Sequence, residues 1–94
     1  MSSQWIAEIV VMPKEGVNDP EGEAILGGLH DLGYETVSRV RSGKRFHVEL
    51  AAKDESQARM LATSMADRLL ANPIIESFAV EHVEQSAEPV ETAI

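Results

Sequence analysis

The chain has 94 residues and carries 8 lysines and arginines against 16 aspartates and glutamates, a formal net charge of −8. This length predicts one domain, which we place at residues 1–84, followed by a polar segment, 85–94, that we expect to be a disordered tail. Such an acidic surface repels phosphate backbones and anionic lipid headgroups, so neither nucleic acid nor a membrane is an expected partner.

The chain contains no cysteine, which excludes disulfide bonds, thiolate metal sites and a cysteine nucleophile. No apolar run approaches the ~20 residues of a membrane span, and the N-terminus lacks the basic segment and apolar core of a secretion signal. We therefore expect a cytoplasmic protein. Because a domain of this size buries only roughly 60 to 68% of its unfolded surface, association with other chains would stabilise it.

Residues 5–12 form the first expected strand, because the segment is rich in β-branched side chains and too short for a typical helix. Both faces of this strand are apolar except at Glu8, a pattern that indicates an interior strand covered on both sides. A helix is then expected over 20–32. Asp19 suits its N-cap, and Gly33 supplies the left-handed position after its end.

Apolar residues at helical spacing predict the buried face of this first helix, and they are Ile25, Leu29 and Leu32. Gly27 and Gly28 lie inside the same helix, where each costs about 1 kcal/mol of helical propensity relative to alanine. Close packing against a sheet or another subunit would explain the glycine pair, and simple tolerance by the fold is the alternative.

Two further strands are expected at 36–41 and 45–51, joined as a hairpin through Ser42-Gly43-Lys44. Apolar and polar side chains alternate along 45–51, which is typical of a half-buried antiparallel strand. One face of this hairpin is therefore expected to pack, and the other to stay polar.

A second helix is expected from Asp54, whose spacing to Gln57 resembles a capping box, to about Ala71. The last strand covers about 74–84. This order of elements predicts an α+β, ferredoxin-like βαββαβ fold with a four-stranded antiparallel sheet and two helices on one face. The other face of the sheet lacks a cover, so we expect a homo-oligomer that buries it.

The residue types that take part in catalysis or metal binding do not occur at the spacings of a known active site. The three histidines lack a second histidine at metal-ligand spacing, and no nucleophile elbow, Walker loop or dinucleotide fingerprint occurs. Asp19, Glu21 and Glu23 form an acidic run, but helix capping and the helix dipole explain it. We expect no catalytic, cofactor-binding or metal-binding residue.

Half of the cations lie around the expected hairpin, namely Arg39, Arg41, Lys44 and Arg45. Such a cluster suits an acidic surface or a phosphate. Lysine and arginine on an edge strand also discourage aggregation, and this structural interpretation stays open.

Ferredoxin-like domains serve several functions, two of which the residues exclude. Copper chaperones of this fold need a cysteine pair, and RNA-binding versions need aromatic platforms that a chain with 4% aromatic residues lacks. An ACT-like small-molecule-binding regulatory module stays open, because Asn18-Asp19-Pro20-Glu21-Gly22 is weakly similar to its ligand loop.

Short motifs stand in a characteristic order and spacing over residues 12–83. They are Pro13-Lys14, Gly16-Val17, Asp19-Pro20, Gly22, Ala24, Leu29, Leu32-Gly33-Tyr34, Val40-Arg41, Gly43-Lys44 and Leu69-Leu70-Ala71-Asn72-Pro73-Ile74-Ile75-Glu76. Each piece is generic, but the combination resembles the PurS family, the small subunit of phosphoribosylformylglycinamidine synthase. Asn18 and the long acidic tail depart from the family pattern.

The resemblance implies a non-catalytic adaptor in de novo purine biosynthesis, at the step that converts formylglycinamide ribonucleotide to its amidine with ATP and glutamine. Such a subunit forms a dimer or tetramer. It brings the glutaminase subunit, which releases ammonia, to the large synthetase subunit, which uses ATP and magnesium. The complex is a ligase, and this subunit is expected to hold no cofactor of its own.

For docking to these partners we single out the expected hairpin and the 13–19 loop. The docking residues are Lys14, Asp19, Arg39, Arg41, Lys44 and Arg45. Reversing the charges of Arg41 and Lys44 is expected to weaken assembly and to leave the isolated subunit folded.

Overall fold

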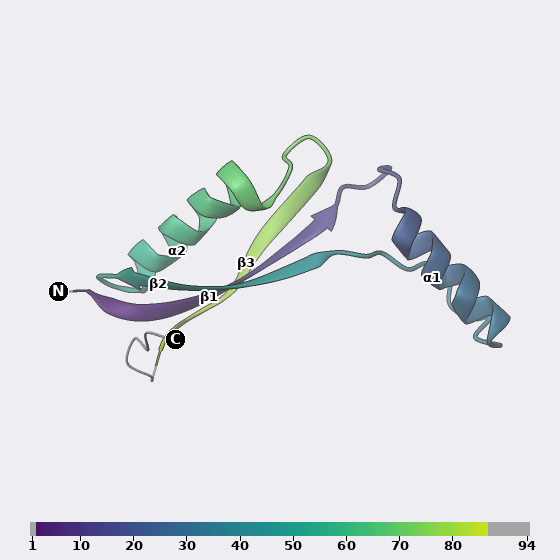
Figure 1. The fold of residues 1–94 in the computed structure, drawn as a ribbon, viewed down its shortest axis with the longest axis horizontal. Coiled ribbons are helices and arrows are strands. Elements are labelled where there is room, and N and C mark those ends of the chain that lie inside the picture. The colour runs from purple at the N-terminus through teal and green to yellow at the C-terminus, as the bar shows by residue number, and fades with distance from the viewer. Residues whose placement is uncertain (1, 87–94) are drawn as a thin grey trace, which may run out of the picture.

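Three antiparallel strands form one sheet in the order β2-β1-β3 in the computed structural model, which describes residues 2–86. The α+β class is therefore confirmed. The elements, in chain order, are β1 (Ser3–Pro13), α1 (Pro20–Asp31), β2 (Lys44–Ala52), α2 (Glu55–Met65), its π-helical continuation η1 (Ala66–Leu70) and β3 (Glu76–Gln85). Figure 1 shows α2 lying along the sheet and α1 projecting beyond the ends of the strands.

β1 is the central strand, as predicted, but within residues 2–86 only one of its faces is covered by a helix (Figure 1). It pairs antiparallel with β2 and β3, so that Ala7 lies opposite Val48 on one side and Val83 on the other. Ala7, Ile9 and Val11 are almost completely buried and form the centre of the core. The alternation of side chains along β1 therefore positions the core on one face of the sheet.

α2 covers this core face with a row of alanines. Ala58, Ala62 and Ala66 are fully buried, because their small side chains let the helix approach the strands closely. Asp54 caps α2 as predicted: its carboxylate accepts the Gln57 N–H at 2.8 Å. The Gln57 amide oxygen in turn accepts the N–H of Lys53, the residue before the cap, at 2.7 Å, in a variant of the capping box.

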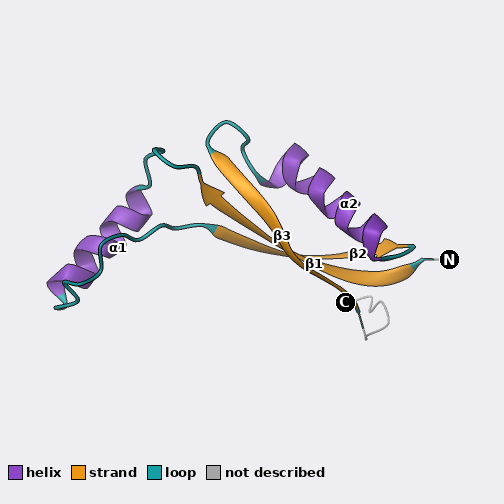
Figure 2. Ribbon diagram, turned by 180° about the vertical axis from the view of Figure 1, so that it is seen from behind, coloured by secondary structure: helices purple, strands orange, loops and turns teal. Residues whose placement is uncertain are grey.

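α1 does not pack on the sheet, so the expectation of two helices on one face is wrong for the single chain. The chain leaves β1, forms α1 and returns beside it to β2 (Figure 2). We call residues 14–43 the arm. Leu32 is 76% exposed and Ile25 is 44% exposed, although both were expected to be buried. The radius of gyration is 17.2 Å, against about 12 Å for a compact domain of this length.

Residues 36–41 do not form the expected fourth strand. The returning segment of the arm runs straight into β2 instead of turning back on it (Figure 1), so the hairpin prediction is wrong. The cause lies at the base of the arm, where Asp19 accepts the Ser42 N–H at 2.8 Å and holds the returning segment beside the start of α1. Within residues 2–86, the outer edge of β2 consequently has no neighbouring strand.

The predicted ends of α1 are correct. The Asp19 carboxylate accepts the Gly22 N–H at 3.0 Å, as an N-cap does. Gly33 has a φ of +102°, the left-handed conformation that glycine adopts without strain. Residues 87–94, most of the expected tail, lie outside the described residues. Over the part of the chain that the structure describes, no helix is long and apolar enough to cross a membrane.

Candidate functional site

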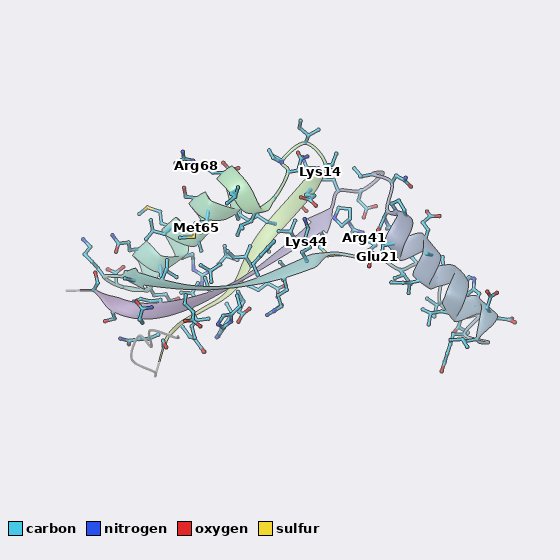
Figure 3. The ribbon with its side chains drawn as sticks, in the orientation of Figure 1. Lys14, Glu21, Arg41, Lys44, Met65 and Arg68 are labelled. Carbon is cyan, nitrogen blue, oxygen red and sulfur yellow. The ribbon has the colours of Figure 1, made fainter. Side chains whose placement is uncertain are left out.

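The base of the arm gathers most of the residues that the sequence singled out for docking. We call this region the neck, and it comprises residues 13–19 and 39–44, where the chain leaves β1 and re-enters β2. Figure 3 shows Lys14, Arg41 and Lys44 close together there, with Glu21 at the start of α1. Arg45, the sixth predicted docking residue, follows the neck and lies on the sheet.

Asp19 ties the outgoing and returning segments of the arm together. Its two carboxylate oxygens accept the N–H of Gly22 at 3.0 Å and of Ser42 at 2.8 Å. The hydrogen bond from Ser42 and then that from Gly22 lower the pKa of Asp19 below its usual value of 3.8, and the positive charge of Arg41 adds to the effect. Asp19 is therefore ionised at neutral pH and acts here as a structural clamp.

The neck arginines are already engaged within the chain. Both terminal nitrogens of Arg39 lie 3.3 Å from the Glu15 carboxylate, and Arg41 lies 3.6 Å from the same group while donating to the Pro13 carbonyl. Beside them is a hollow of about 130 Å³ that Leu26 and Val40 also line. Ion pairs this exposed contribute at most about 1 kcal/mol each.

The two neck lysines connect the arm to the turn before β3. Lys14 donates its backbone N–H to Ile75 at 2.9 Å and its ammonium to the Pro73 carbonyl at 2.6 Å. Lys44 lies 3.7 Å from Glu76 at the start of β3. The neck and this turn thus form one continuous surface at one end of the sheet.

The face of the sheet opposite α2 carries a charge network centred on Glu8. The Glu8 carboxylate lies 2.7 Å from His47 and 3.4 Å from Arg45, which also reaches Glu81 at 3.1 Å. The hydrogen bond with His47 lowers the pKa of Glu8, and the same contact, followed by that with Glu49, raises the pKa of His47. The open face is therefore polar along its middle.

The described charged groups of the neck and of the open face make ion pairs and hydrogen bonds within the chain. Within residues 2–86, no group of three or more histidines, aspartates and glutamates is placed to hold a metal ion. The interactions of the neck join segments of the chain, and they orient the arm relative to the sheet. Its chemistry is that of charged and polar contacts at the surface.

Comparison with known proteins identifies the family. A sequence profile named PurS, described as phosphoribosylformylglycinamidine (FGAM) synthase, matches residues 6–84. The chain belongs to the PurS family. The PurS subunit of Archaeoglobus fulgidus is 39% identical over 80% of this chain and 94% of its own length, and that of Synechocystis is 42% identical over 86% and 81%.

Solved structures of the PurS family share the fold. The structure of Thermus thermophilus PurS superposes with a TM-score of 0.79 at 36% identity and covers 86% of this chain and 95% of that one. A chain in the structure of PurLQS from Thermotoga maritima matches with a TM-score of 0.74 at 28% identity over 88% and 98%. The chain is thus a PurS subunit of FGAM synthase, and the ACT-like alternative is not supported.

Sequence reasoning missed one surface, at the turn between η1 and β3. Leu69 and Ile74 are 82% and 81% exposed, and Ile75 is 43% exposed. The sequence predicted that Ile74 begins a strand, which starts at Glu76 instead. The one available signal was Asn72-Pro73, which predicts a turn directly before these isoleucines.

Proposed function

We propose that this subunit is a non-catalytic adaptor that bridges the glutaminase and the ATP-dependent synthetase of FGAM synthase. The PurLQS structure supports the assignment of partners, because a PurS relative is part of that assembly. An adaptor position gives such a small chain an essential role without chemistry of its own. The cytoplasmic location expected from the sequence stays a prediction.

One observation carries this proposal: several large apolar side chains are exposed on the arm, on η1 and at the turn before β3, outside the core. Leu32, Tyr34, Leu69 and Ile74 are each more than half exposed, whereas the charged groups of the neck pair within the chain. Large apolar side chains left exposed outside the core are suited to burial against another protein.

Ammonia supplies the physical reason for an adaptor. Ammonia released into water is diluted and protonated, whereas two active sites held in fixed alignment give it a high effective concentration. We propose that the synthetase binds the ATP and magnesium, and that this subunit binds no cofactor. Its contribution is then the geometry of the assembly.

We further propose that two copies of this chain exchange their arms. Within residues 2–86, the outer edge of β2 lacks a neighbour, and residues 37–41, which have the composition of a strand, belong to no helix or strand. Pairing 36–41 of one copy with β2 of the other supplies the fourth strand. The same exchange places α1 of the first copy beside α2 of the second. Two chains together then form the ferredoxin-like arrangement.

The surface of α1 fits a close neighbour. A side chain built at Gly27 or Gly28 would meet no atom within 4 Å in the single chain. Glycines on the exposed face of a helix let another backbone approach closely. The homo-oligomer therefore accounts for two residues that otherwise only weaken α1.

We propose that the six predicted docking residues contact the partner subunits; five of them lie in the neck, and Arg45 lies beside it on the sheet. Arg39 and Lys44 are 57% exposed at the side chain, whereas Arg41 is 30% exposed and holds the Pro13 carbonyl. The double variant Arg39→Glu with Lys44→Glu therefore tests docking and disturbs the structure of the neck less than a substitution of Arg41 would. We expect it to bind the partner subunits more weakly while the circular dichroism spectrum of the isolated chain stays unchanged.

The experiment that tests the proposal measures assembly. Purified synthetase and glutaminase subunits are mixed with and without this chain, and the masses of the species are determined by light scattering after gel filtration. We expect a complex that contains both catalytic subunits only when the chain is present. A complex of synthetase and glutaminase with the same mass ratio in its absence would overturn the adaptor proposal.

A further inference from the structure

One side of α1 is apolar, exposed and interrupted by a glycine. Residues three or four positions apart lie on the same side of a helix. Ala24, Gly28 and Leu32 follow this spacing, and all three are exposed, as is the neighbouring Ile25. A side chain built at Gly28 meets no atom within 4 Å in the single chain. This side of α1 therefore has a recess at its centre and is open to solvent.

α2 has a half-covered side that faces β2. Arg59 donates to the Val80 carbonyl at 3.3 Å, so the Arg59 side of α2 lies toward β3. Leu61 lies about 200° around the helix from Arg59, and Met65 follows Leu61 on the same side; both are only partly buried. Because β1 lies between β3 and β2, the Leu61 side of α2 lies toward β2. In a ferredoxin-like domain, the first helix occupies this space.

Opposite charges lie at the ends of these two surfaces. Glu21 begins the row on α1, three positions before Ala24, and Arg68 ends the row on α2 and η1, three positions after Met65. Glu21 accepts the hydroxyl of Ser42, whereas the Arg68 side chain has no ion pair or hydrogen bond within residues 2–86. Figure 3 shows Glu21 well apart from Met65 and Arg68 in the single chain. In the proposed exchange, α1 comes from the other copy and brings Glu21 with it.

The register of the two helices follows from their directions. α1 follows β1 and α2 follows β2, and these two strands are antiparallel, so the helices run antiparallel in a ferredoxin-like domain. Residue numbers then rise along one helix as they fall along the other. With Glu21 opposite Arg68, the next pairs along the rows are Ala24 with Met65 and Gly28 with Leu61. Rows with spacings of three and four residues are the ones that interlock when two helices pack.

We propose that α1 of one copy lies antiparallel on α2 of the other, where Gly28 receives the Leu61 side chain and Glu21 pairs with Arg68. This inference rests on the exchange of arms proposed above, and it assigns the contacts by which α1 recognises a second copy. The recess at Gly28 determines the register, and the charge pair adds selectivity for the antiparallel direction.

The first test exchanges the two charges between copies of the full-length chain. Glu21→Lys places two cations opposite each other at both contacts of the pair, and Arg68→Glu places two carboxylates there. We expect each variant alone to form the two-chain assembly about tenfold more weakly. An equimolar mixture of the two variants should form a mixed pair with wild-type affinity, because both contacts then join opposite charges.

Native mass spectrometry, with one variant isotope-labelled, separates the mixed pair from pairs of identical chains, and analytical ultracentrifugation gives the dissociation constants. Glu23→Lys is the matched control. Glu23 is exposed in the same turn of α1 as Glu21, but it lies about 200° around the helix from it. A mixture of Glu23→Lys with Arg68→Glu should therefore not form the mixed pair with wild-type affinity.

The second test compares the two neighbouring glycines of α1. Gly27 and Gly28 lie about 100° apart around the helix, and a side chain built at either meets no atom within 4 Å in the single chain. Gly28→Leu should weaken the two-chain assembly at least about tenfold, because the new side chain fills the recess that Leu61 needs. Gly27→Leu adds the same side chain on the side of Glu23, so we expect wild-type affinity. The close approach at the glycine pair is thereby narrowed to Gly28.

Different results would overturn the inference and the exchange on which it rests. If the wild type forms a two-chain assembly but the mixture of Glu21→Lys with Arg68→Glu yields no mixed pair, the charge contact is rejected. Equal affinities of the two glycine variants would reject the register. A wild-type chain with the mass of one chain would reject the exchange of arms itself, and with it the second copy that this inference requires.

Discussion

Glu8 and His47 couple the open face of the sheet to pH. The pKa of His47 is raised above 6.5, so its contribution to stability is complete below pH 6.5 and is lost as pH rises through the folded value. The pKa of Glu8 is lowered below 4.5, so its contribution is present above pH 4.5 and is lost as pH falls through the folded value. The pair therefore contributes its full stabilisation between pH 4.5 and pH 6.5.

Replacing Glu8 by glutamine removes the main cause of the raised histidine pKa. We expect Glu8→Gln to shift the pKa of His47 down toward 6.5, as measured by NMR titration of the imidazole protons. Glu84→Gln is the matched control, since Glu84 contacts His82 at 2.8 Å and not His47. A His47 pKa that stays the same in Glu8→Gln would contradict the pairing.

Among the elements, α2 depends on small residues along its buried face. Ala62→Leu places a larger side chain where the alanine is fully buried, and we expect it to lower the free energy of unfolding by about 1 to 3 kcal/mol through overpacking. Ser64→Leu on the exposed side of the same helix should change it by less than about 0.5 kcal/mol. Urea denaturation measures both, and equal effects would contradict the placement of α2.

The same elements show what sequence patterns can predict. The interior position of β1, the Asp19 and Asp54 caps and the Gly33 helix end follow from local residues, and all are present. The candidate docking residues were chosen by their charge and by their places in an expected hairpin and loop; that these two segments meet at the neck, and that the arginines pair with Glu15, was not predicted. That pairing joins residues more than twenty positions apart, and no local pattern encodes it.

For the whole molecule, the sequence could not specify whether residues 36–41 pair with their own chain or, as we propose, with a second copy. Ser42-Gly43-Lys44 has the composition of a turn, and residues 36–41 make the same strand contacts whether they fold back on their own β2 or on that of a second copy. In the proposed exchange, the choice depends on Asp19, which holds Ser42 beside the start of α1. Because α1 does not pack on its own sheet, Ile25 and Leu32 stay exposed in the single chain.

Lengthening that connection should change the assembly. We expect an insertion of four glycine and serine residues between Ser42 and Gly43 to let 36–41 fold back, so that the mass falls to that of one chain. The radius of gyration from X-ray scattering should then fall toward the about 12 Å of a compact domain. An insertion after Gln85, which leaves the arm unchanged, is the control. An unchanged mass in the Ser42 variant would argue against exchange of the arms.

The most direct measurement for the account as a whole is turnover by the reconstituted enzyme, with nitrogen supplied either by glutamine or by ammonium salt. If the chain works by alignment, turnover on glutamine needs it, whereas turnover on ammonium salt depends on it far less. Full-speed turnover on glutamine from synthetase and glutaminase alone would contradict the account. The same holds for amidation by the isolated chain.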